Sequence, residues 1–372
     1  MSVDPIPSSW CEIHLDRVSK NLELTLGLLP KGAAFCAVMK ADAYGHGISR
    51  IVPLLSEQKV TCVGITSNAE ARSVRDAGFS GTLLRLRAAT LQEIEAALPD
   101  RVEEQVGSPW VAKQLRKLLE SGRGYCRVHF PLNAGGMSRD GLDISTTVGQ
   151  QNCREILDEI GQNIVGISTH FPTNEPAGLK HNSDLFKQEV EWVCGNSDLN
   201  RSELLVHAGS TLTLLSGERV ETDMYRCGAI LYGILNSELG FHPTMELKAN
   251  VVHVGVYPKG ATVGYDRDSR LDSDRRLACI SIGYAAGYRR IAKGRGAVLI
   301  CDKLAPVLGK ISMNSIIADV TEIPNVQIGD IATVFGTNSA QAIDPKATMD
   351  KFGTILPDLF SDWGIRNPRI YR

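Results

Sequence analysis

The chain has 372 residues, and its 40 Lys and Arg against 42 Asp and Glu give a formal net charge of −2 at pH 7. This balance provides no basic surface for a polyanion, so nucleic acid is not an expected partner. No stretch approaches the roughly 18 consecutive apolar residues of a membrane-spanning helix, and the first residues lack the basic and apolar regions of a signal peptide. We therefore expect a soluble protein, cytoplasmic unless a leader was removed, with one large and one smaller domain.

The first two thirds of the chain repeat one unit, a short apolar run followed by an amphipathic helix. An extended piece at residues 10–15 and a helix over 18–29 precede the repeats. The apolar runs lie at residues 33–39, 61–65, 82–86, 102–106, 125–132, 164–169, 204–208 and 224–232. Eight strand and helix units in roughly 200 residues predict a (β/α)₈ barrel of the α/β class, which we place at residues 12–235.

Two of the intervening helices have clear sequence signals. After the second run, Ser67 and Glu70 can cap and open a helix, and Gly78 can end it. A further helix over 110–119 places Val111 and Leu115 on one apolar face.

The pattern changes beyond residue 236. Short alternating runs, separated by Pro, Gly and Asp turns, lie at residues 249–257, 277–282, 296–300, 305–308, 316–320 and 331–335. Helical periodicity is nearly absent until residues 347–359. We therefore predict a mainly antiparallel β domain at residues 236–372, with residues 1–11 packed on it.

A lysine stands at the end of the first apolar run. Lys40 follows a buried strand and precedes a turn that contains Gly45 and Gly47, which would allow a close approach of the backbone to a ligand. Desolvation there would lower the pKa of the amine and favour Schiff-base or general-base chemistry. An isolated lysine at a strand end more often simply reaches solvent.

Polar residues recur at the ends of the other predicted strands. In a (β/α)₈ barrel these ends meet on one rim, where the chemistry takes place. The residues collected there are Lys40, Arg85, Arg87, Asn133, Arg139, His170, Ser210, Arg226 and Gly228. Each could be structural by itself, but together they predict a functional site on this rim.

The nine cysteines show neither CxxC pairs nor metal-ligand spacing, so most of them are expected to be small core residues and no metal site is predicted. Cys36 and Cys62 fall at similar depths on the first two predicted strands. Neighbouring parallel strands could bring their Cα atoms within disulfide range.

The segment 37–47 around Lys40 resembles the pyridoxal-phosphate lysine motif of the alanine racemase family, whose barrel is of fold type III. The segment 226–233 resembles the arginine motif of the same family, and the resemblance extends over nearly the whole chain. It implies a pyridoxal 5'-phosphate cofactor, a barrel followed by a β domain, and a homodimer with shared active sites that acts on an amino-acid substrate.

The resemblance assigns the cofactor site residue by residue. Lys40 matches the lysine that holds the cofactor through a Schiff base, and Arg226 matches the arginine that faces its pyridine nitrogen. The phosphate would be held by residues that match Tyr44, Ser210, Gly228 and Ala229. His170 matches the histidine that connects the arginine to the second catalytic base.

The second base and the substrate contacts come from the β domain in this family. Tyr265 matches that base, contributed by the partner subunit, so that Lys40 and Tyr265 exchange the α-proton on opposite faces. Tyr284 matches an entrance residue. The backbone amide of Met313, together with Arg139, matches the groups that bind the substrate carboxylate.

Departures from the ordinary alanine racemase pattern resemble the broad-spectrum amino-acid racemases instead. Pro131 stands where alanine racemases carry a lysine modified to a carbamate, the segment 133–139 begins with Asn133, and Asn314 replaces an acidic residue. Ile365 replaces a tyrosine that narrows the pocket. We expect a wider substrate range than alanine alone.

Cysteines at the positions of Cys36 and Cys62 also occur in the periplasmic members of this group. The resemblance therefore favours a disulfide between them and export to the periplasm.

Three alternatives stay open at this stage: a strict alanine racemase, a decarboxylase on the same barrel, and a non-catalytic pyridoxal-phosphate carrier. A decarboxylase would need another acid at the position of Tyr265, usually a cysteine, and a carrier would resemble the barrel alone.

Overall fold

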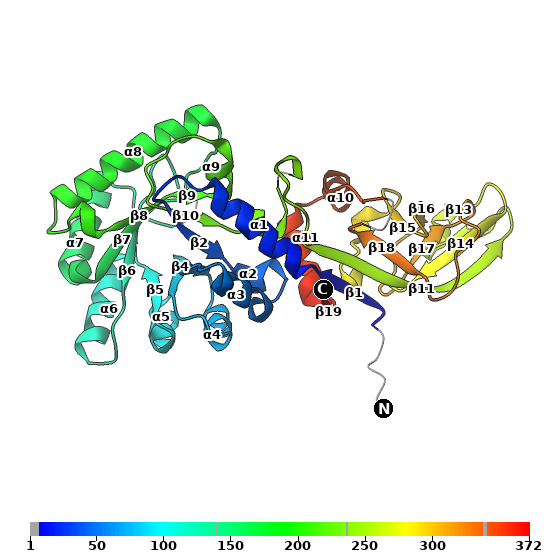
Figure 1. Ribbon diagram of the computed structural model, residues 1–372, viewed down its shortest axis with the longest axis horizontal. Helices are drawn as coiled ribbons and strands as arrows, with labels where there is room; N and C mark the ends of the chain where they lie inside the picture. Colours follow the sequence, from blue (N-terminus) through cyan, green and yellow to red (C-terminus); the bar gives the residue numbers. More distant parts are fainter. Residues whose placement is uncertain (1–6, 138–139, 236, 338–340) are drawn as a thin grey trace. The chain divides into compact units, whose positions relative to one another are not determined.

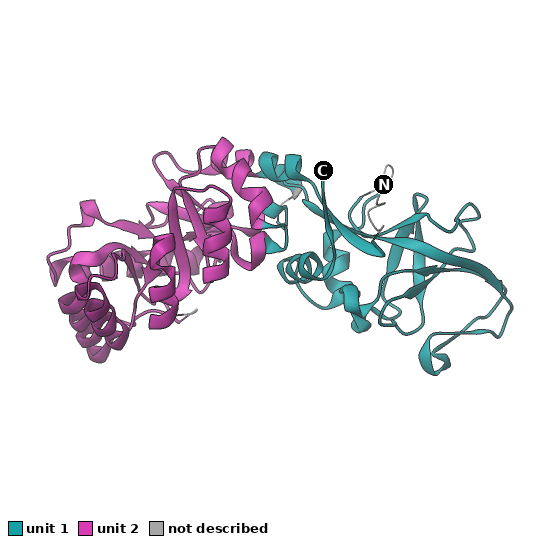
Figure 2. Cartoon of the chain, turned by 90° about the horizontal axis from the view of Figure 1, so that it is seen from below, with its two compact units in different colours: residues 1–21, 44–47, 232–372 teal, residues 22–43, 48–231 magenta. Residues whose placement is uncertain are grey.

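A computed structural model of the chain describes residues 7–137, 140–235, 237–337 and 341–372. The chain forms two compact units, coloured separately in Figure 2. The barrel unit comprises residues 22–43 and 48–231, and the β unit comprises residues 1–21, 44–47 and 232–372. Among the described residues, no helix is both long and apolar enough to cross a bilayer.

The barrel unit is built on a sheet whose neighbouring strands all run parallel. The strands are β2 (Ala34–Val38), β3 (Cys62–Ile65), β4 (Thr82–Ala88), β5 (Val102–Gln105), β6 (Val128–Pro131), β7 (Ile164–Ser168), β8 (Leu205–His207), β9 (Gly209–Ser210) and β10 (Met224–Cys227). The sheet runs in the order β8-β7-β6-β5-β4-β3-β2-β10-β9, and only Ala208 separates β8 from β9, so the strands close into a ring. The predicted (β/α)₈ barrel is confirmed.

Helices surround this ring in Figure 1. They are α3 (Ile48–Glu57), α4 (Asn68–Asp76), α5 (Leu91–Ala97), α6 (Pro109–Glu120), α7 (Thr147–Ile160), α8 (Pro176–Gly195) and α9 (Thr211–Ser216), with 3₁₀ turns η1 (Leu98–Asp100), η2 (Gly161–Asn163) and η3 (Arg201–Glu203). The predicted cap of α4 is present, since Ser67 Oγ accepts from the amide of Glu70 while the Glu70 carboxylate accepts from the amide of Ser67. Helix α6 buries Ala112, Leu115 and Leu118.

The β unit contains a closed antiparallel barrel. Its strands are β11 (Met245–Tyr257), β14 (Arg275–Ile280), β15 (Ala297–Ile300), β16 (Lys303–Leu308), β17 (Ile316–Asp319) and β18 (Ile331–Phe335). They follow the order β14-β17-β16-β15-β18-β11, and a further β11 to β14 pairing closes the ring. The prediction of a mainly antiparallel β domain is therefore confirmed.

Both ends of the described chain join this sheet. Strand β1 (Ser9–Ile13) pairs antiparallel with β11, and β19 (Arg369–Tyr371) pairs parallel with β1. Helix α1 (Leu15–Leu28) follows β1. The unit also contains β12 (Thr262–Val263), β13 (Ser269–Arg270) and the 3₁₀ turns η5 (Ser237–Leu239), η6 (Tyr265–Arg267), η7 (Tyr284–Ala286) and η8 (Arg290–Ala292).

Two predicted elements differ from the structure. The single helix expected over 347–359 is two helices, α10 (Pro345–Phe352) and α11 (Leu356–Arg366), because Gly353 adopts a left-handed φ of 63° and ends the first. The last barrel run, expected over 224–232, ends as a strand at Cys227 and continues as η4 (Ala229–Tyr232).

A lysine is buried in the β unit without an acidic partner among the described residues. Lys351 of α10 is 5% exposed; its Nζ lies 3.4 Å from the carbonyl oxygen of Ala297 and over the rings of Tyr288 and Phe352. Burial lowers the pKa of Lys351 from 10.5 to about 8. The native state therefore binds this proton less tightly than the unfolded chain does.

We expect Lys351→Met to raise the free energy of unfolding at pH 7 by on the order of 2 kcal/mol, because it removes a desolvated charge at little change in volume. For the unmodified chain, the penalty is fully present below pH 8 and disappears as the pH rises from about 8 to 10.5. Urea unfolding of both proteins at pH 7 and pH 10.5 measures the gain in stability of Lys351→Met and its dependence on pH. The exposed Lys346→Met of the same helix is the control, and an equal gain in both variants would contradict the argument.

Candidate active site

Lys40 lies at the carboxyl end of β2, at the start of an unusual turn. The segment α2 (Lys40–Tyr44) has left-handed φ angles from Ala41 to Tyr44, between 52° and 57°. Each non-glycine residue in this conformation costs roughly 1–2 kcal/mol, so neighbouring structure must hold the turn.

Hydrogen bonds to backbone amides hold it. The amide of Ala43 donates to the carbonyl of Met39 at 2.8 Å, and Asp42 Oδ1 accepts from the amide of Ile48 at 2.8 Å. Glu70 Oε1 accepts from the amide of Ala41 at 2.7 Å, while its Oε2 accepts from the amide of Thr66 at 2.7 Å. The cap of α4 therefore also fixes the residue that follows Lys40.

We expect Glu70→Gln to lower the free energy of unfolding by about 1–3 kcal/mol, because an amide cannot accept hydrogen bonds on both of its ends. One of the two donors, the amide of Ala41 or of Thr66, would then face an NH₂ group. Equilibrium urea unfolding measures the loss. Glu57→Gln, at the exposed end of α3, is the matched control and should change stability by less than about 0.5 kcal/mol.

The glycines after this turn pack closely against other parts of the β unit. A Cβ on Gly45 would lie 2.2 Å from the carbonyl oxygen of Phe360 in α11, and one on Gly47 would lie 2.4 Å from the hydroxyl of Tyr371 in β19. Both have positive φ angles, 80° and 92°. Their lack of a side chain allows this close packing within the β unit, and an approach of the backbone to a ligand stays a prediction.

Arg226 is anchored by hydrogen bonds to groups at the ends of two other strands. From β10, its Nη1 donates to His207 Nδ1 at 2.5 Å and to the carbonyl of His207 at 2.7 Å, and its Nη2 donates to the carbonyl of Thr169 at 2.7 Å. The half-buried His170 directly follows Thr169. The guanidinium is thus held between the ends of β7, β8 and β10.

Hydroxyl and amide donors gather beside Arg226. Ser210 is the register partner of Arg226 on β9 and caps α9 through its hydroxyl, which lies 3.3 Å from the amide of Thr213. The amide of Gly228 donates to Thr211 Oγ1 at 3.3 Å, and Ala229 opens η4. Because β2, β10 and β9 are neighbours in the sheet, these groups share the carboxyl-terminal face with Lys40.

Tyr44 belongs to the β unit. Its ring is 8% exposed and packs against Tyr232 with 4.8 Å between ring centroids. His46 packs on the same tyrosine, and its Nε2 lies 2.8 Å from Thr244 Oγ1.

Three predicted motifs of the β unit come together. A Cβ on Gly264, the residue before Tyr265, would lie 2.7 Å from the amide nitrogen of Lys310, and Lys310 Nζ pairs with Asp266 at 2.5 Å. The amide of Tyr284 donates to Ser312, next to Met313, at 3.0 Å. Tyr265 and Met313 are 64% and 52% exposed, so the motifs present an exposed surface.

The remaining motif residues of this surface differ in exposure. Tyr284 is half-buried, whereas Asn314 is exposed.

The predicted rim residues of the barrel unit are not all placed as expected. Asn133 Nδ2 donates to the carbonyl of Gly141 at 2.8 Å, and Arg139 lies outside the described residues. Arg85 is fully buried in a bidentate pair with Glu104, at 2.6 and 3.0 Å. It is not a rim group, because the acid on the neighbouring strand draws it into the wall of the barrel.

Arg87 is also used structurally. Its Nη2 pairs with Glu93 Oε1 at 2.5 Å at the start of α5. This pairing and the capping hydrogen bond from the Thr90 amide lower the pKa of Glu93 to about 2.

Cys36 and Cys62 are register partners on β2 and β3, as their sequence positions predicted. Both are buried free thiols in this structure, and the disulfide between them stays a prediction. Contact with the Cys36 thiol, together with burial, raises the pKa of Cys62 well above its usual value. Alkylation followed by mass spectrometry of the oxidised and reduced protein distinguishes the two states.

A cavity of about 190 Å³ opens where β4, β5 and β6 end. Pro131 forms part of its wall, with Val106, Gln105 and Asp140. Pro131 therefore borders open space at the carboxyl-terminal face of the barrel.

Three functional candidates were missed by the sequence analysis: Glu103, His129 and His207. They lie inside the barrel and connect to Arg226. Burial, followed by the charge of Arg226, lowers the pKa of His207 well below its usual value. Polar residues inside three of the predicted strand runs were the available signal: Glu103 in 102–106, His129 in 125–132, and His207, the single polar residue of 204–208.

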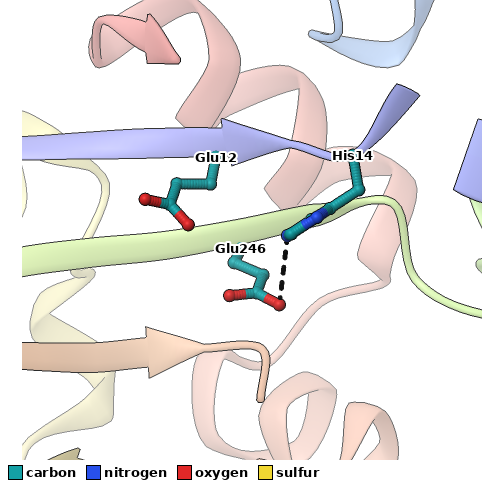
Figure 3. A group of neighbouring side chains, drawn as sticks. All are labelled: Glu12, His14 and Glu246. Atoms are coloured by element: carbon teal, nitrogen blue, oxygen red, sulfur yellow. Dashed lines mark ion pairs between the residues drawn. The ribbon is translucent and has the colours of Figure 1, made fainter. Parts of the chain in front are cut away.

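Among the described residues, one cluster with metal-ligating residue types lies in the β unit. Figure 3 shows Glu12, His14 and Glu246 with their side chains turned toward one another. Lys248 Nζ pairs with Glu12 at 2.7 Å and Glu246 at 3.0 Å, and Arg17 also pairs with Glu246. Because cations already occupy these carboxylates, the cluster is an ion-pair network that ties β1 to β11.

Burial alone would raise the pKa of Glu246, but its contacts with His14 and Lys248 lower it to about 2. This carboxylate is therefore charged at neutral pH, as an ion-pair network requires.

The fold and the site define a two-domain enzyme: a parallel barrel that carries a lysine and an anchored arginine at its catalytic face, followed by an antiparallel β domain. The chain belongs to the alanine racemase family. The profile of the alanine racemase N-terminal domain matches residues 13–236, and that of the C-terminal domain matches residues 244–371.

Individual relatives agree with this membership. The chain is 38% identical to a broad specificity amino-acid racemase of Pseudomonas taetrolens and 36% identical to a lysine racemase of Proteus mirabilis, covering 98% of this chain and 90% of either relative. A solved alanine racemase from Bartonella henselae with covalently bound pyridoxal phosphate has the same fold. It aligns with 99% of this chain and 100% of that chain, with a TM-score of 0.83 and 22% identity.

Proposed function

We propose that this chain is a pyridoxal-phosphate-dependent amino-acid racemase of broad specificity that works as a homodimer. The observation that carries the proposal is the grouping of Lys40, Arg226 and Ser210 at the carboxyl ends of adjacent strands, with the guanidinium fixed by three hydrogen bonds. Relatives over 98% of the chain carry amino-acid racemase names, which supports the same reaction class.

The donor set fits the cofactor chemically. Lys40 offers an amine for the aldehyde, Arg226 a donor for the pyridine nitrogen, and Ser210 with the amides of Gly228 and Ala229 offers neutral donors for a phosphate. We assign Tyr44 to the same phosphate group. When bound, pyridoxal phosphate acts as an electron sink that acidifies the α-C–H of an attached amino acid.

Two bases on opposite faces would exchange the α-proton. Lys40 Nζ removes or returns it on one face, and the phenol oxygen of Tyr265 of the partner subunit does so on the other. A free tyrosine has a pKa near 10, so it needs a proton relay at neutral pH. We assign this relay to His170, which follows the Thr169 carbonyl that accepts from Arg226.

The exposed position of Tyr265 supports a shared site. At 64% exposure it cannot act as a shielded base within the β unit alone, so we propose that a second copy of the chain covers it. The segments that carry Tyr284, Met313 and Asn314 adjoin Tyr265 and would bring the substrate-binding groups to the same site, together with Asn133 and Arg139 of the barrel.

Broad specificity is supported by the residues at the family's substrate positions. Pro131 cannot carry a carbamate, and Ile365 is 73% exposed and has no hydroxyl. Hydrophobic and neutral walls discriminate weakly between side chains of different length. We also propose that the protein is exported to the periplasm. This location predicts a disulfide between Cys36 and Cys62 in the protein isolated from cells.

Incubation of the pure holoenzyme with L-amino acids in deuterated water tests the function. Alanine, serine, lysine, arginine and methionine form the panel, read by chiral chromatography with mass detection of α-deuteration. D-products from several long side chains would support broad specificity, whereas turnover of alanine alone would restore a strict alanine racemase. Cofactor binding without any inversion would exclude a racemase.

A further inference from the structure

A chain of buried polar side chains runs through the interior of the barrel to Arg226. Glu103 on β5, His129 on β6 and His207 on β8 are 7%, 1% and 0% exposed. His129 Nε2 lies 2.8 Å from Glu103 Oε2, His207 Nε2 lies 2.8 Å from His129 Nδ1, and Arg226 Nη1 lies 2.5 Å from His207 Nδ1. Every polar atom of the two imidazoles is therefore used.

These contacts permit only one direction of donation. A guanidinium only donates, so His207 Nδ1 must accept and the proton of His207 must be on Nε2. That proton is donated to His129 Nδ1, which leaves the proton of His129 on Nε2, where it is donated to the carboxylate of Glu103. Both histidines are neutral, and Glu103 fixes both tautomers.

The barrel provides space for this arrangement at one strand position. Gly166 on β7 is the register partner of His129, and a Cβ on it would lie 2.3 Å from His129 Nδ1. Any larger residue would displace the imidazole from its contact with His207. The lowered pKa of His207, caused first by burial and then by Arg226, agrees with a neutral imidazole.

We infer that Glu103 and His129 are positioning residues for catalysis: through a hydrogen-bonded chain of fixed direction they hold His207 as the acceptor that orients Arg226. The inference rests on the proposed function, because Arg226 is the residue assigned to the cofactor ring. Without that acceptor, the guanidinium would keep only the carbonyls of His207 and Thr169 among these partners.

The contacts of Glu103 allow one substitution, Glu103→Gln, to test the direction of donation. Its other oxygen, Oε1, lies 3.2 Å from Nε of Arg127, whose side chain is 52% exposed. In Glu103→Gln the introduced amide has one oxygen for two donors, Arg127 and His129, and we expect it to turn that oxygen toward the charged guanidinium, which makes the stronger hydrogen bond. Its NH₂ group then faces His129 Nε2, and the donation along His129 and His207 must reverse.

Reversal would place a proton on His207 Nδ1, directly against the N–H of Arg226. We expect Glu103→Gln to lower kcat by about 10- to 100-fold with a change in KM of less than about threefold. Selective ¹⁵N-histidine labelling of the holoenzyme reports the tautomers, with Nε2–H expected for His129 and His207 in the unmodified protein and Nδ1–H in Glu103→Gln.

Two variants serve as controls. Glu104→Gln alters the adjacent buried carboxylate, which pairs with Arg85 outside this chain of contacts, and should leave tautomers and kcat unchanged. Adding Arg127→Ala to Glu103→Gln frees the amide to turn its oxygen toward His129, which should restore the Nε2–H tautomers and most of kcat.

The outcomes are distinct. Reversed tautomers with reduced kcat, together with rescue by Arg127→Ala, support the inference. Nδ1–H or doubly protonated His207 in the unmodified holoenzyme overturns it even if Glu103→Gln does not fold, as does an unchanged kcat after reversal. If the unmodified protein has the expected tautomers but inverts no amino acid, the tautomer assignment is supported and the proposed function fails by itself.

Discussion

A mixed dimer of one Lys40→Ala chain and one Tyr265→Ala chain is expected to recover about half of the racemase activity of the unmodified dimer, although each parent variant is inactive. If each site combines Lys40 of one chain with Tyr265 of the other, the mixed dimer has one site with both bases and one with neither. The exposure of Tyr265 in its own β unit motivates this expectation.

Co-expression with two different affinity tags isolates the mixed dimer, and chiral chromatography measures its turnover. A doubly tagged dimer in which both chains carry Lys40→Ala is the matched control, because it undergoes the same purification without a complete site. A mixed dimer as inactive as its parents would contradict a shared site and indicate that each chain forms its site alone.

Regular structure was predictable because each buried strand needs an apolar run and each helix needs a cap. Each of the eight predicted runs therefore contains a strand of the barrel, and the Ser67 and Glu70 cap is present. The ends of helices were harder to predict than their presence. Gly353 divides the last predicted helix, because its left-handed conformation ends a helix even where the apolar periodicity continues on either side.

Partners across strands were not predictable from the sequence alone. The sequence predicts Arg85 as a rim residue. In the structure, the pairing of β4 with β5 places Glu104, 19 positions later in the chain, beside it. The same holds for His129 and His207, which are 78 positions apart. Polar residues within the predicted strand runs are visible in the sequence, but their pairing requires the closed barrel, and so does the space left by Gly166.

Arg226→Lys is expected to lower kcat by about 100- to 1000-fold, corresponding to about 3–4 kcal/mol of transition-state stabilisation. The guanidinium serves His207 Nδ1, the His207 carbonyl and the Thr169 carbonyl from one rigid plane. An ammonium is a compact point charge that cannot reach all three acceptors from the position of the fork, and it can lose its proton when desolvated. In Arg226→Lys, the side chain that we assign to the cofactor ring would therefore be held less firmly. A deprotonated amine would also present a lone pair to the ring nitrogen, where the guanidinium always presents an N–H donor.

Steady-state kinetics and α-deuterium incorporation measure the loss, and cofactor content separates weaker binding from slower proton exchange. Arg87→Lys is the matched control, since Arg87 stands near the end of β4 in the same sheet and makes an ion pair with Glu93 that a lysine can largely replace. A fall of less than about threefold for Arg226→Lys, with full cofactor content, would mean that positive charge alone suffices. The three fixed hydrogen bonds would then be structural, and the direction of donation through His207 would have no catalytic consequence.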